Sequence, residues 1–272
     1  MDYNFVKTDW KSENLKLYSD LLSKVFTDTK KYTSEFLDWQ YSKNPNGKVV
    51  GFDAFYGSEL AAHYVTIPVQ YNFNDEIVKG LLSLNTVTHP QHQGKGLFTK
   101  LAERTYDYGA EQEYKFVIGV ANQNSTHGFL KKLGFNLISP LDVQIFTGKP
   151  KAGKINSDLI KSEWSSESAA WRLTNPSANY LNNNSCVSSK THLKLIHAIL
   201  SKRTEFKTEK LISKSSSLKM TIGLNIKNKL KVNLPASLKP SPLNLIFKPL
   251  GDFKKQVNKT NIYFELIDFD AY

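Results

Sequence analysis

The chain has 272 residues, of which 40% are hydrophobic and 22% are charged. This composition excludes wholesale disorder, and the length suits two domains of ordinary size. The single cysteine, Cys186, excludes a disulfide within the chain and argues against a metal site built from cysteines. The sequence shows neither a run of about 18 apolar residues nor a signal-peptide pattern, so we expect a cytoplasmic protein without a membrane span.

The positive charge of the chain is concentrated in its second half. Residues 1–148 hold 15 Lys+Arg and 16 Asp+Glu, a net charge of −1. Residues 149–272 hold 21 Lys+Arg and 9 Asp+Glu, a net charge of +12, which together give the +11 of the whole chain. A basic half attracts nucleic acid, acidic lipid or phosphorylated small molecules. A solvated lysine-rich surface explains the same charge, so both interpretations stay open.

Hydrophobic periodicity and turn residues predict a mixture of helices and strands in the first half. In chain order, we predict helices over residues 15–26 and 34–41, strands over 49–56, 59–71 and 77–88, a helix over 97–112, a strand over 116–121, a helix over 125–133, and a strand over 141–147.

Residues 148–154 are the best candidate linker, so we expect one domain over residues 1–148 and another over 149–272. Strand-like runs recur in the second half at residues 218–224, 230–234, 244–247 and 262–267. The sequence Trp171-Arg-Leu-Thr-Asn-Pro176 also resembles Trp39-Gln-Tyr-Ser-Lys-Asn-Pro45. We interpret the second half as a degenerate internal repeat; the alternative is an unrelated α+β lid.

The sequence around Gly94 and Gly96 has the pattern of an anion-binding turn between a strand and a helix. The first turn of a helix presents unpaired N–H groups and a partial positive charge. Because glycine lacks a Cβ atom, a phosphate can approach these amides closely, which favours a pyrophosphate ligand. The segment lacks the third glycine of a dinucleotide fingerprint, since Thr99 stands there, and it does not fit a P-loop.

This segment resembles the signature Gln/Arg-x-x-Gly-x-Gly/Ala of the Gcn5-related N-acetyltransferases (GNAT). Residues 91–96 match the signature letter by letter, whereas alignment on Pro90 places the signature at residues 93–98. We prefer the second alignment. Phe98 then departs from the pattern, as it does in the Eis-like branch. A second landmark lies in residues 117–125, followed by Phe129 and by Leu133-Gly134-Phe135. The resemblance covers residues 5–148.

The resemblance implies an α+β GNAT fold in the first half, followed by a degenerate GNAT-like second half. It implies acyl-coenzyme A as co-substrate, bound where the fourth and fifth strands splay apart. No spacing of His, Cys, Asp or Glu indicates a metal site. The expected coenzyme A contacts are Thr86, Val87, Thr88, Gln93, Gly94, Lys95, Gly96, Leu97, Phe98, Asn122, Ser125 and Phe129.

The candidates for the catalytic machinery are few. His63 and His89 are the candidate general bases, although a strand histidine is often structural and His89 can simply cap the turn. Asn85 is a candidate to hold the acceptor. The tyrosine that protonates the thiolate in the family is replaced here by Leu130, so the sequence names no general acid.

The whole pattern is similar to bacterial nucleotide-sugar N-acyltransferases with tandem GNAT halves. The resembling segments are residues 37–47, 62–68 and 264–270. The similarity implies transfer of an acetyl or 3-hydroxybutanoyl group from acetyl-CoA or 3-hydroxybutanoyl-CoA to a dTDP-linked amino-dideoxy sugar, for the lipopolysaccharide or O-antigen. We expect a monomer. The candidate acceptor-binding residues, for which core packing is the alternative, are Trp39, Tyr41, Trp171, Arg172 and Tyr180.

Two other classes of function stay open. One is an Eis-like peptide or aminoglycoside N-acetyltransferase, although a cationic antibiotic favours an acidic cleft. The other is a nucleic-acid-binding protein with a vestigial acyltransferase domain, which the charge suits but for which no recognition motif occurs. We therefore expect a small-molecule acceptor rather than nucleic acid.

Overall fold

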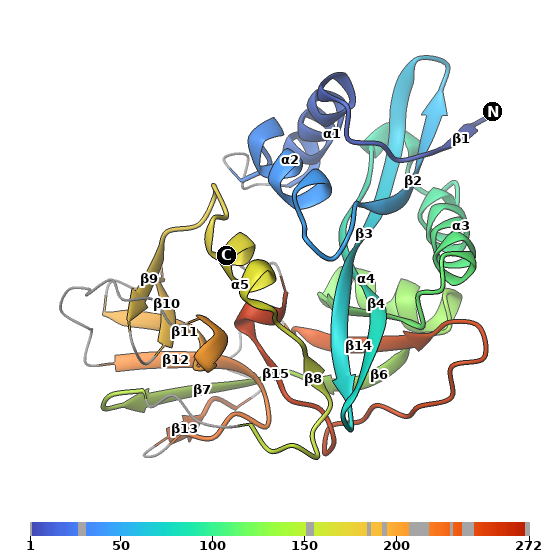
Figure 1. Cartoon of the computed structure of the whole chain (residues 1–272). Coiled ribbons are helices and arrows are strands. Elements are labelled where there is room, and N and C mark those ends of the chain that lie inside the picture. The colour runs from blue at the N-terminus through green and yellow to red at the C-terminus, as the bar shows by residue number, and fades with distance from the viewer. Residues whose placement is uncertain are drawn as a thin grey trace.

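The computed structural model describes residues 2–26, 31–150, 155–183, 186–191, 195–206, 218–228, 231–235 and 242–269. Two mixed β-sheets make up most of the fold; the second lies at the lower left of Figure 1, and helices pack on the faces of the first. This is the mixed α+β architecture that the sequence predicts. No helix in the described residues is both long and apolar enough to cross a membrane.

The first sheet follows the strand order β1-β2-β3-β4-β5-β14-β6, and the short strand β8 pairs with β3 at its side. All neighbours are antiparallel except β4 and β5, which run parallel. The strands are β1 (Asn4–Lys7), β2 (Val50–Tyr56), β3 (Glu59–Phe73), β4 (Glu76–Thr88), β5 (Phe116–Ala121), β6 (Asn136–Pro140), β8 (Lys161–Ser162) and β14 (Asn244–Pro249).

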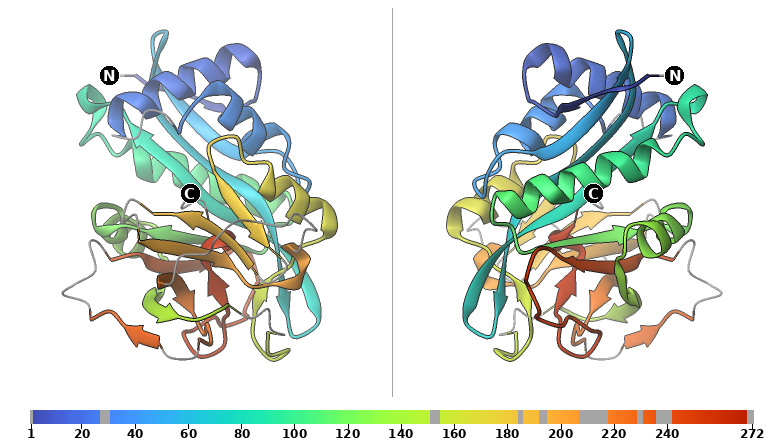
Figure 2. Two further views of the ribbon diagram at one scale, coloured as in Figure 1. Left: turned by 90° about the vertical axis from the view of Figure 1, so that its left-hand side faces the viewer. Right: turned by 90° about the vertical axis from the view of Figure 1, so that its right-hand side faces the viewer.

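Helices cover both faces of this sheet (Figure 2). Helices α1 (Ser12–Val25) and α2 (Ser34–Ser42) pack on one face, and the Thr33 side chain caps α2 by accepting a hydrogen bond from the Phe36 N–H. Helix α3 (Leu97–Glu111) packs on the opposite face. Its buried side chains recur at helical spacing, at Leu97, Leu101, Ala102 and Thr105, which is why this segment forms an amphipathic helix.

The chain between β5 and β6 is not the single helix over residues 125–133 that the sequence predicts. A short helix, α4 (Gln123–His127), is followed by one turn of π-helix, η2 (Gly128–Lys132). The Asn122 side chain starts α4 by accepting hydrogen bonds from the Asn124 and Ser125 N–H groups, each at 3.0 Å. Wide π-type turns of this kind often occur next to functional sites.

The second sheet has the order β13-β7-β12-β11-β10-β9, with β15 paired to β12. Helix α5 (Ser166–Leu173) and the 3-10 turns η3 (Thr204–Phe206) and η5 (Leu266–Asp268) accompany it. The strands are β7 (Asp142–Thr147), β9 (Tyr180–Asn183), β10 (Cys186–Lys190), β11 (Ile196–Ser201), β12 (Leu218–Leu224), β13 (Lys231–Asn233) and β15 (Phe264–Glu265).

The two sheets exchange strands across the expected boundary at residue 148. Strand β14, from the second half, lies between β5 and β6 of the first sheet, whereas β7, from the first half, joins the second sheet. One apolar core also contains side chains of both sheets, among them Ile67 and Phe116 from the first and Leu200 and Phe264 from the second. The boundary therefore does not separate the sheets, and residues 151–154 of the expected linker lie outside the described residues.

The two copies of the Trp…Asn-Pro motif contact each other through their tryptophans. The indole Nε1 of Trp39 in α2 donates to the carbonyl oxygen of Trp171 in α5, and Trp171 Nε1 donates to the Trp39 carbonyl oxygen, both at 3.1 Å. The two ring systems are stacked with centroids 4.7 Å apart. Asn44 and Asn175, which precede the two prolines, each accept a hydrogen bond from the N–H two residues on. The motif thus repeats in structure as well as in sequence, which supports a duplication.

Candidate functional site

Strands β4 and β5 diverge after a short parallel contact and leave a cleft between them. They pair only at residues 81–83 of β4 and 117–119 of β5. Beyond this contact lies a cleft of about 150 Å³. The cleft is lined by Phe26, Ser83, Leu84, Thr86, Gly119, Val120, Asn122, Ser125, Phe129 and Ile246. This is the splay that the resemblance implies for a pantetheine slot, and it contains the expected residues Thr86, Asn122, Ser125 and Phe129.

A β-bulge interrupts β4 beside the cleft. His63 of β3 is paired with Val87 of β4, but Val65 is paired with Leu84, so β4 contains an additional residue here. Asn85 lies in this bulge with φ of 44°, in the left-handed region. A bulge takes backbone groups out of the ladder and turns them in a new direction. The segment that follows the sheet contact therefore has backbone N–H groups that can face a ligand.

The glycine turn lies at the end of the same strand. Gly94 and Gly96 have φ values of 75° and 73°, which glycine adopts readily and other residues adopt at a cost. A Cβ atom built on either glycine meets nothing within 4 Å, so their surroundings are open. Gly96 immediately precedes the first residue of α3, a helix of 15 residues. The turn therefore directs unpaired amides and the positive end of a helix into open space, as an anion site requires.

A hollow of about 200 Å³ covers this turn. Gln93 and Phe98 line it, whereas Gln91 does not, which favours the alignment on Pro90. The Gln93 side chain donates from Nε2 to the Thr88 carbonyl oxygen at 3.4 Å, and Lys95 Nζ donates to the Gln91 carbonyl oxygen at 3.2 Å. The full lining is Thr88, His92, Gln93, Gly94, Gly96, Leu97, Phe98, Thr99 and Lys132.

Two of the expected coenzyme A contacts have their side chains in the protein core. Val87 and Leu97 are 3% and 1% exposed, so only their backbones can contact a ligand. Phe98 and Phe129 contact each other edge to face, with ring centroids 5.2 Å apart. This aromatic pair joins the lining of the hollow to the lining of the cleft.

His63 is the centre of a buried hydrogen-bonded chain and not an open base. Its side chain is completely buried, with Nδ1 2.6 Å from Asp53 Oδ1 and Nε2 2.9 Å from the Tyr41 hydroxyl. The Asn85 amide nitrogen donates to the Tyr41 hydroxyl at 2.9 Å and to Gln40 Oε1 at 2.7 Å. Since both ring nitrogens of His63 are occupied, it cannot contact an acceptor amine directly.

The buried chain contains residues that the sequence analysis missed. Asp53 also accepts hydrogen bonds from the hydroxyls of Tyr18, at 2.8 Å, and Thr8, at 3.0 Å. Burial, together with the nearby Asp53 carboxylate, raises the pKa of Tyr18 far above its ordinary value. Among the described residues, the buried Gln40 Nε2 has no hydrogen-bond partner. The available signal was Asp53, an acidic residue within an otherwise apolar strand.

His89 lies away from the cleft. Its Nδ1 accepts a long contact of 3.4 Å from the Gln91 N–H, which caps the 3-10 turn η1 (Pro90–His92), and its Nε2 lies 3.8 Å from Glu59 Oε1. The structure therefore shows His89 in the capping position that was the alternative to a catalytic role.

The expected acceptor-binding residues are mostly buried in packing. Trp39 and Tyr41 are 4% and 0% exposed, and the Arg172 side chain donates to the Phe269 carbonyl oxygen at 2.8 Å. Trp171 stacks on Trp39, so one face of each indole is covered by the other ring. The half-buried Tyr180 accepts a 3.4 Å contact from Asn175 Nδ2. For the two tryptophans this contact matches core packing, the alternative to ligand stacking.

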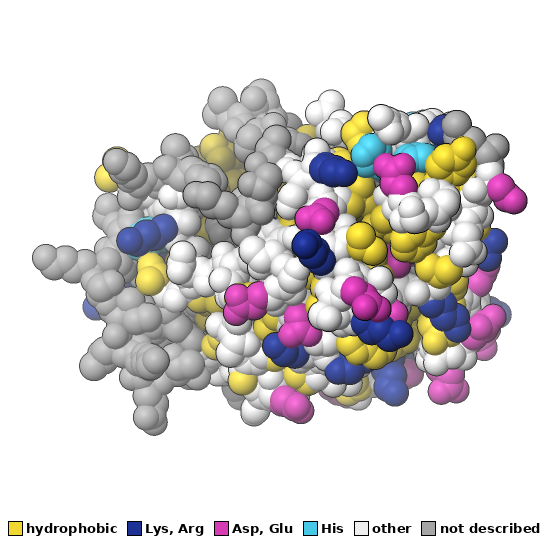
Figure 3. Space-filling view, turned by 90° about the horizontal axis from the view of Figure 1, so that it is seen from above, with side chains coloured by type: hydrophobic (Ala, Val, Ile, Leu, Met, Phe, Trp, Pro, Cys, Tyr) yellow, Lys and Arg dark blue, Asp and Glu magenta, His cyan; other side chains and the backbone are white. Residues whose placement is uncertain are grey.

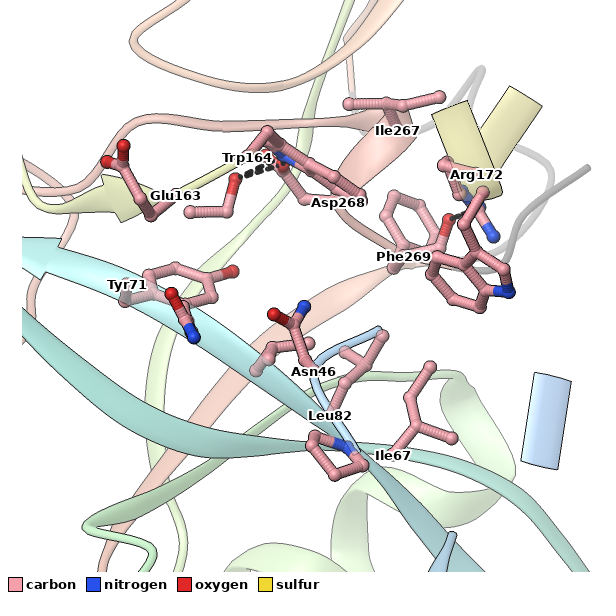
Figure 4. A pocket seen from close by; sticks show the side chains of 15 residues that line it. Asn46, Ile67, Tyr71, Leu82, Glu163, Trp164, Arg172, Ile267, Asp268 and Phe269 are labelled. Carbon is pink, nitrogen blue, oxygen red and sulfur yellow. Dashed lines mark hydrogen bonds between the residues drawn. The ribbon is translucent and has the colours of Figure 1, made fainter. Parts of the chain in front are cut away.

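A second cavity lies between β3 and β4 of the first sheet and the second half of the chain (Figure 4). Ile67, Leu82 and Phe269 give it apolar walls, and the Tyr71 hydroxyl is at its side. That buried hydroxyl has no hydrogen-bond partner among the described residues. With a volume of about 30 Å³, the cavity has room for roughly one water molecule, so it is too small for a substrate.

Comparisons with known proteins agree with this geometry. The family model described as an acetyltransferase (GNAT) domain matches residues 9–138, which include the cleft and the turn. A protein of Enterococcus faecalis V583, described as a probable N-acyltransferase, has a TM-score of 0.64 at 9% identity, over 92% of this chain and 73% of its own. A GCN5-related N-acetyltransferase from Anabaena variabilis ATCC 29413 has a TM-score of 0.58 at 9% identity, over 90% and 72%. No curated protein matches the sequence.

At such low identity the two solved structures show a shared fold, which extends over both halves of the chain. The family match adds the class. Residues 9–138 match the GNAT acetyltransferase domain, and this match supports an acyl-CoA-dependent N-acyltransferase.

Proposed function

We propose that the hollow over residues 93–98 binds the diphosphate of acyl-CoA and that the cleft between β4 and β5 takes its pantetheine arm. The observation that carries this proposal is that the two spaces lie next to each other. Thr86 lines the cleft and Thr88 lines the hollow, only two residues further along one strand, a rise of about 7 Å. The contact between Phe98 and Phe129 connects them on the other side. One extended ligand with an anionic end fits this arrangement.

In this placement the thioester lies beside the bulge at Asn85. Backbone N–H groups released by the bulge are suited to donate to the thioester carbonyl oxygen as it gains negative charge. The acceptor nitrogen attacks the carbonyl carbon, the C–S bond breaks, and the thiolate of coenzyme A leaves. The nitrogen loses one proton in the process.

That proton is proposed to leave through water. No titratable side chain is among the described residues that line the cleft. His63 is sealed by Asp53 and Tyr41, so it does not reach the amine. The acceptor must therefore arrive as the neutral amine, and the rate is expected to rise with pH up to the pKa of the acceptor.

We assign to the buried chain a positioning role. Asn85 has an unfavourable positive φ, and the hydrogen bonds from its amide to Tyr41 and Gln40 hold it there. In Tyr41→Phe, Asn85 and His63 each lose a partner. We expect kcat to fall about ten-fold or more while the affinity for coenzyme A stays the same. An unchanged kcat, or an equal loss of coenzyme A affinity, would contradict a positioning role at the thioester.

The proposed acceptor is the amino group of a dTDP-linked amino-dideoxy sugar, with an acetyl or 3-hydroxybutanoyl group as the acyl, in the synthesis of surface polysaccharide. The supporting observation is the net charge of +12 on residues 149–272, which favours an anionic acceptor. The stacking on Trp39 and Trp171 that we expected from the sequence does not contribute, since these rings pack on each other.

The test is an acyl-transfer assay that follows free thiol. The protein is incubated with acetyl-CoA or 3-hydroxybutanoyl-CoA and with dTDP-amino sugars, aminoglycosides or amine-terminated peptides. Thiol release that depends on the sugar nucleotides supports the proposal. Release only with the cationic acceptors would rule out the sugar acceptor and leave the acyl-CoA site in place. Absence of acyl-CoA binding by calorimetry would overturn the placement of the cofactor itself.

A further inference from the structure

Three potential metal ligands meet beside the glycine turn, next to the hollow that we propose for the diphosphate. Glu59 starts β3, whereas His89 and His92 flank the turn η1. Glu59 Oε2 lies 3.3 Å from His92 Nε2, and Glu59 Oε1 lies 3.8 Å from His89 Nε2. Ligand atoms of all three residues lie within 4.8 Å of one another. Histidine and acidic side chains meet on the face of the molecule shown in Figure 3.

We propose that Glu59, His89 and His92 form a binding site for a divalent transition-metal ion such as Zn²⁺ or Co²⁺. Two imidazole nitrogens and one carboxylate oxygen are a common zinc donor set, with water in the fourth position. Bonds of about 2.0–2.1 Å in a tetrahedron place the ligand atoms about 3.3 Å apart. Glu59 Oε2 already lies at this distance from His92 Nε2. His89 Nε2 lies 3.8 Å from the other oxygen, Oε1, and all three ligand atoms lie within 4.8 Å of one another, so His89 must move closer when an ion binds.

The surroundings orient His92 as a ligand. Its side chain is almost completely buried, and its Nδ1 lies 2.8 Å from the hydroxyl of Tyr3. Its ring also contacts the rings of Tyr3 and Tyr56. A hydrogen bond on one ring nitrogen fixes the ring and leaves the other nitrogen, here Nε2, directed at the metal position. Tyr3 thus occupies the place of an outer partner that supports a ligand.

His89 needs only a small adjustment. Its Nδ1 accepts the 3.4 Å contact from the Gln91 N–H, and binding of a metal through Nε2 would place a proton on Nδ1 and replace this contact. A contact of that length is weak and costs little to lose. The Nε2 atom already faces Glu59, so the imidazole does not have to turn around.

Ion pairing alone is a weak explanation for the meeting of Glu59, His89 and His92. The Glu59 side chain is 46% exposed, and pairs between an exposed carboxylate and a histidine contribute little to stability. A metal would join three segments that are distant in sequence: the residue before β1, through Tyr3; the start of β3, through Glu59; and the turn η1 with its capping residue, through the two histidines. His92 also lines the hollow over the glycine turn, so the ion would stand next to the proposed diphosphate site.

The experiment is titration of the tag-free protein, treated with chelator, with Co²⁺ alone. We expect one equivalent to bind, with the visible absorption of four-coordinate Co²⁺, and Zn²⁺ to displace it. Glu59→Gln keeps the shape of a half-exposed side chain and should weaken binding at least about ten-fold. His89→Ala should do the same. Tyr3→Phe should weaken binding about ten-fold, as expected for an outer partner.

His197→Gln is the matched control, because it removes a histidine from β11 in the second sheet and should leave Co²⁺ binding unchanged. Circular dichroism and thermal unfolding without metal check that each variant is folded. Binding that is equally strong in wild type, Glu59→Gln and His89→Ala would overturn the proposal. Absence of Co²⁺ and Zn²⁺ binding to the wild type at micromolar concentrations would overturn it too, and would leave an ion pair only.

Discussion

At the scale of single residues, three positive φ angles shape the proposed acyl-CoA site. Gly94 and Gly96 adopt them without a side-chain penalty, whereas Asn85 adopts one with the help of hydrogen bonds to Gln40 and Tyr41. A side chain other than glycine in the left-handed region costs about 1–2 kcal/mol. This strain energy is small compared with the binding free energy that a negatively charged side chain would remove at an anion site.

The variant Gly96→Asp, compared with a control glycine, separates the effect of backbone strain from the effect of a negative charge. The new carboxylate points into the open hollow, against the proposed diphosphate, so coenzyme A affinity measured by calorimetry should fall at least about 100-fold. Gly57→Asp is the control, because Gly57 also has a positive φ, of 60°, and nothing within 4 Å of an added Cβ, but lies in the hairpin between β2 and β3. Both variants should lose about 1–2 kcal/mol of stability from backbone strain. Unchanged affinity in Gly96→Asp would mean that the turn is not the diphosphate site.

The sequence could predict the glycine turn because its evidence is local: a strand, two glycines and a helix follow one another within about 15 residues. It could not predict the state of His63, because Asp53 and Tyr41 reach it from a neighbouring strand and a helix on one face of the sheet. The metal ligands were missed for the same reason. His89 and His92 are close in sequence, but Glu59 is about thirty residues away and meets them only through the pairing of β3 with β4.

At the scale of elements, a buried ionic cluster fastens η5 to the second sheet. Arg203, just after β11, donates from Nε to Glu265 Oε1 at 2.8 Å and from an Nη atom to Asp268 Oδ2 at 3.1 Å. It also donates to the Ser162 carbonyl oxygen of β8 at 2.6 Å. Burial raises the pKa of Glu265, and Arg203 only partly opposes this. The cluster therefore fixes the position of η5 on the second sheet. It is not a simple net gain in unfolding free energy, because burying its charges costs free energy.

The raised pKa of Glu265 predicts a pH effect with a definite sign. Because ionisation is harder in the folded state, the contribution of Glu265 to stability is complete below its ordinary pKa of 4.5 and is lost as the pH rises through the raised value. The unfolding free energy of Glu265→Gln minus that of the wild type should therefore increase above pH 4.5, by at most about 1.4 kcal/mol per pH unit. Urea unfolding of both proteins between pH 4 and 8 measures this; a difference that stays constant or falls would contradict it.

The short strands of the second half explain why its elements were harder to predict. Residues 218–224 were correctly predicted as a strand and form β12, in which the half-buried Leu218, Met220 and Ile222 alternate with the buried Lys219, Thr221 and Gly223. Residues 262–267 were predicted as one strand, but only Phe264–Glu265 forms a strand, Ile262 makes a single bridge to Ile160, and the chain then turns into η5. The turn is fixed by Asp268, which accepts a hydrogen bond from the Glu265 N–H. Contacts with Arg203, about sixty residues away, hold both acids in place.

At the scale of the whole molecule, the chain completes its first sheet only near its end. Strand β14 fills the space between β5 and β6, so the chain leaves the first sheet after β6 and, apart from the short strand β8, returns to it only at β14. Such an excursion cannot be recognised from composition or from a candidate linker, because strand pairing between residues about 120 apart leaves no local signal. Because the two sheets share one apolar core and exchange strands, we expect them to be energetically coupled and to unfold in one transition.

The contact between Trp39 and Trp171 offers a direct measure of that coupling. Trp39→Phe and Trp171→Phe each remove one indole N–H bond to the partner's carbonyl oxygen and disturb one stacked pair. Each should cost about 1–3 kcal/mol in urea unfolding, and because the two contacts are reciprocal, the double variant should deviate from additivity by about 0.5–3 kcal/mol.

Trp10→Phe provides the comparison for this cycle, since Trp10 is 42% exposed and lies outside the contact. Combined with Trp171→Phe it should be additive within about 0.5 kcal/mol. If the unfolding free energies of Trp39→Phe and of Trp10→Phe are equally additive with that of Trp171→Phe, the repeated motifs do not couple the two halves energetically. A single unfolding transition with coupling confined to the Trp39 pair would instead identify the two copies of the Trp…Asn-Pro motif as the joint through which the second half is held against the acyltransferase domain.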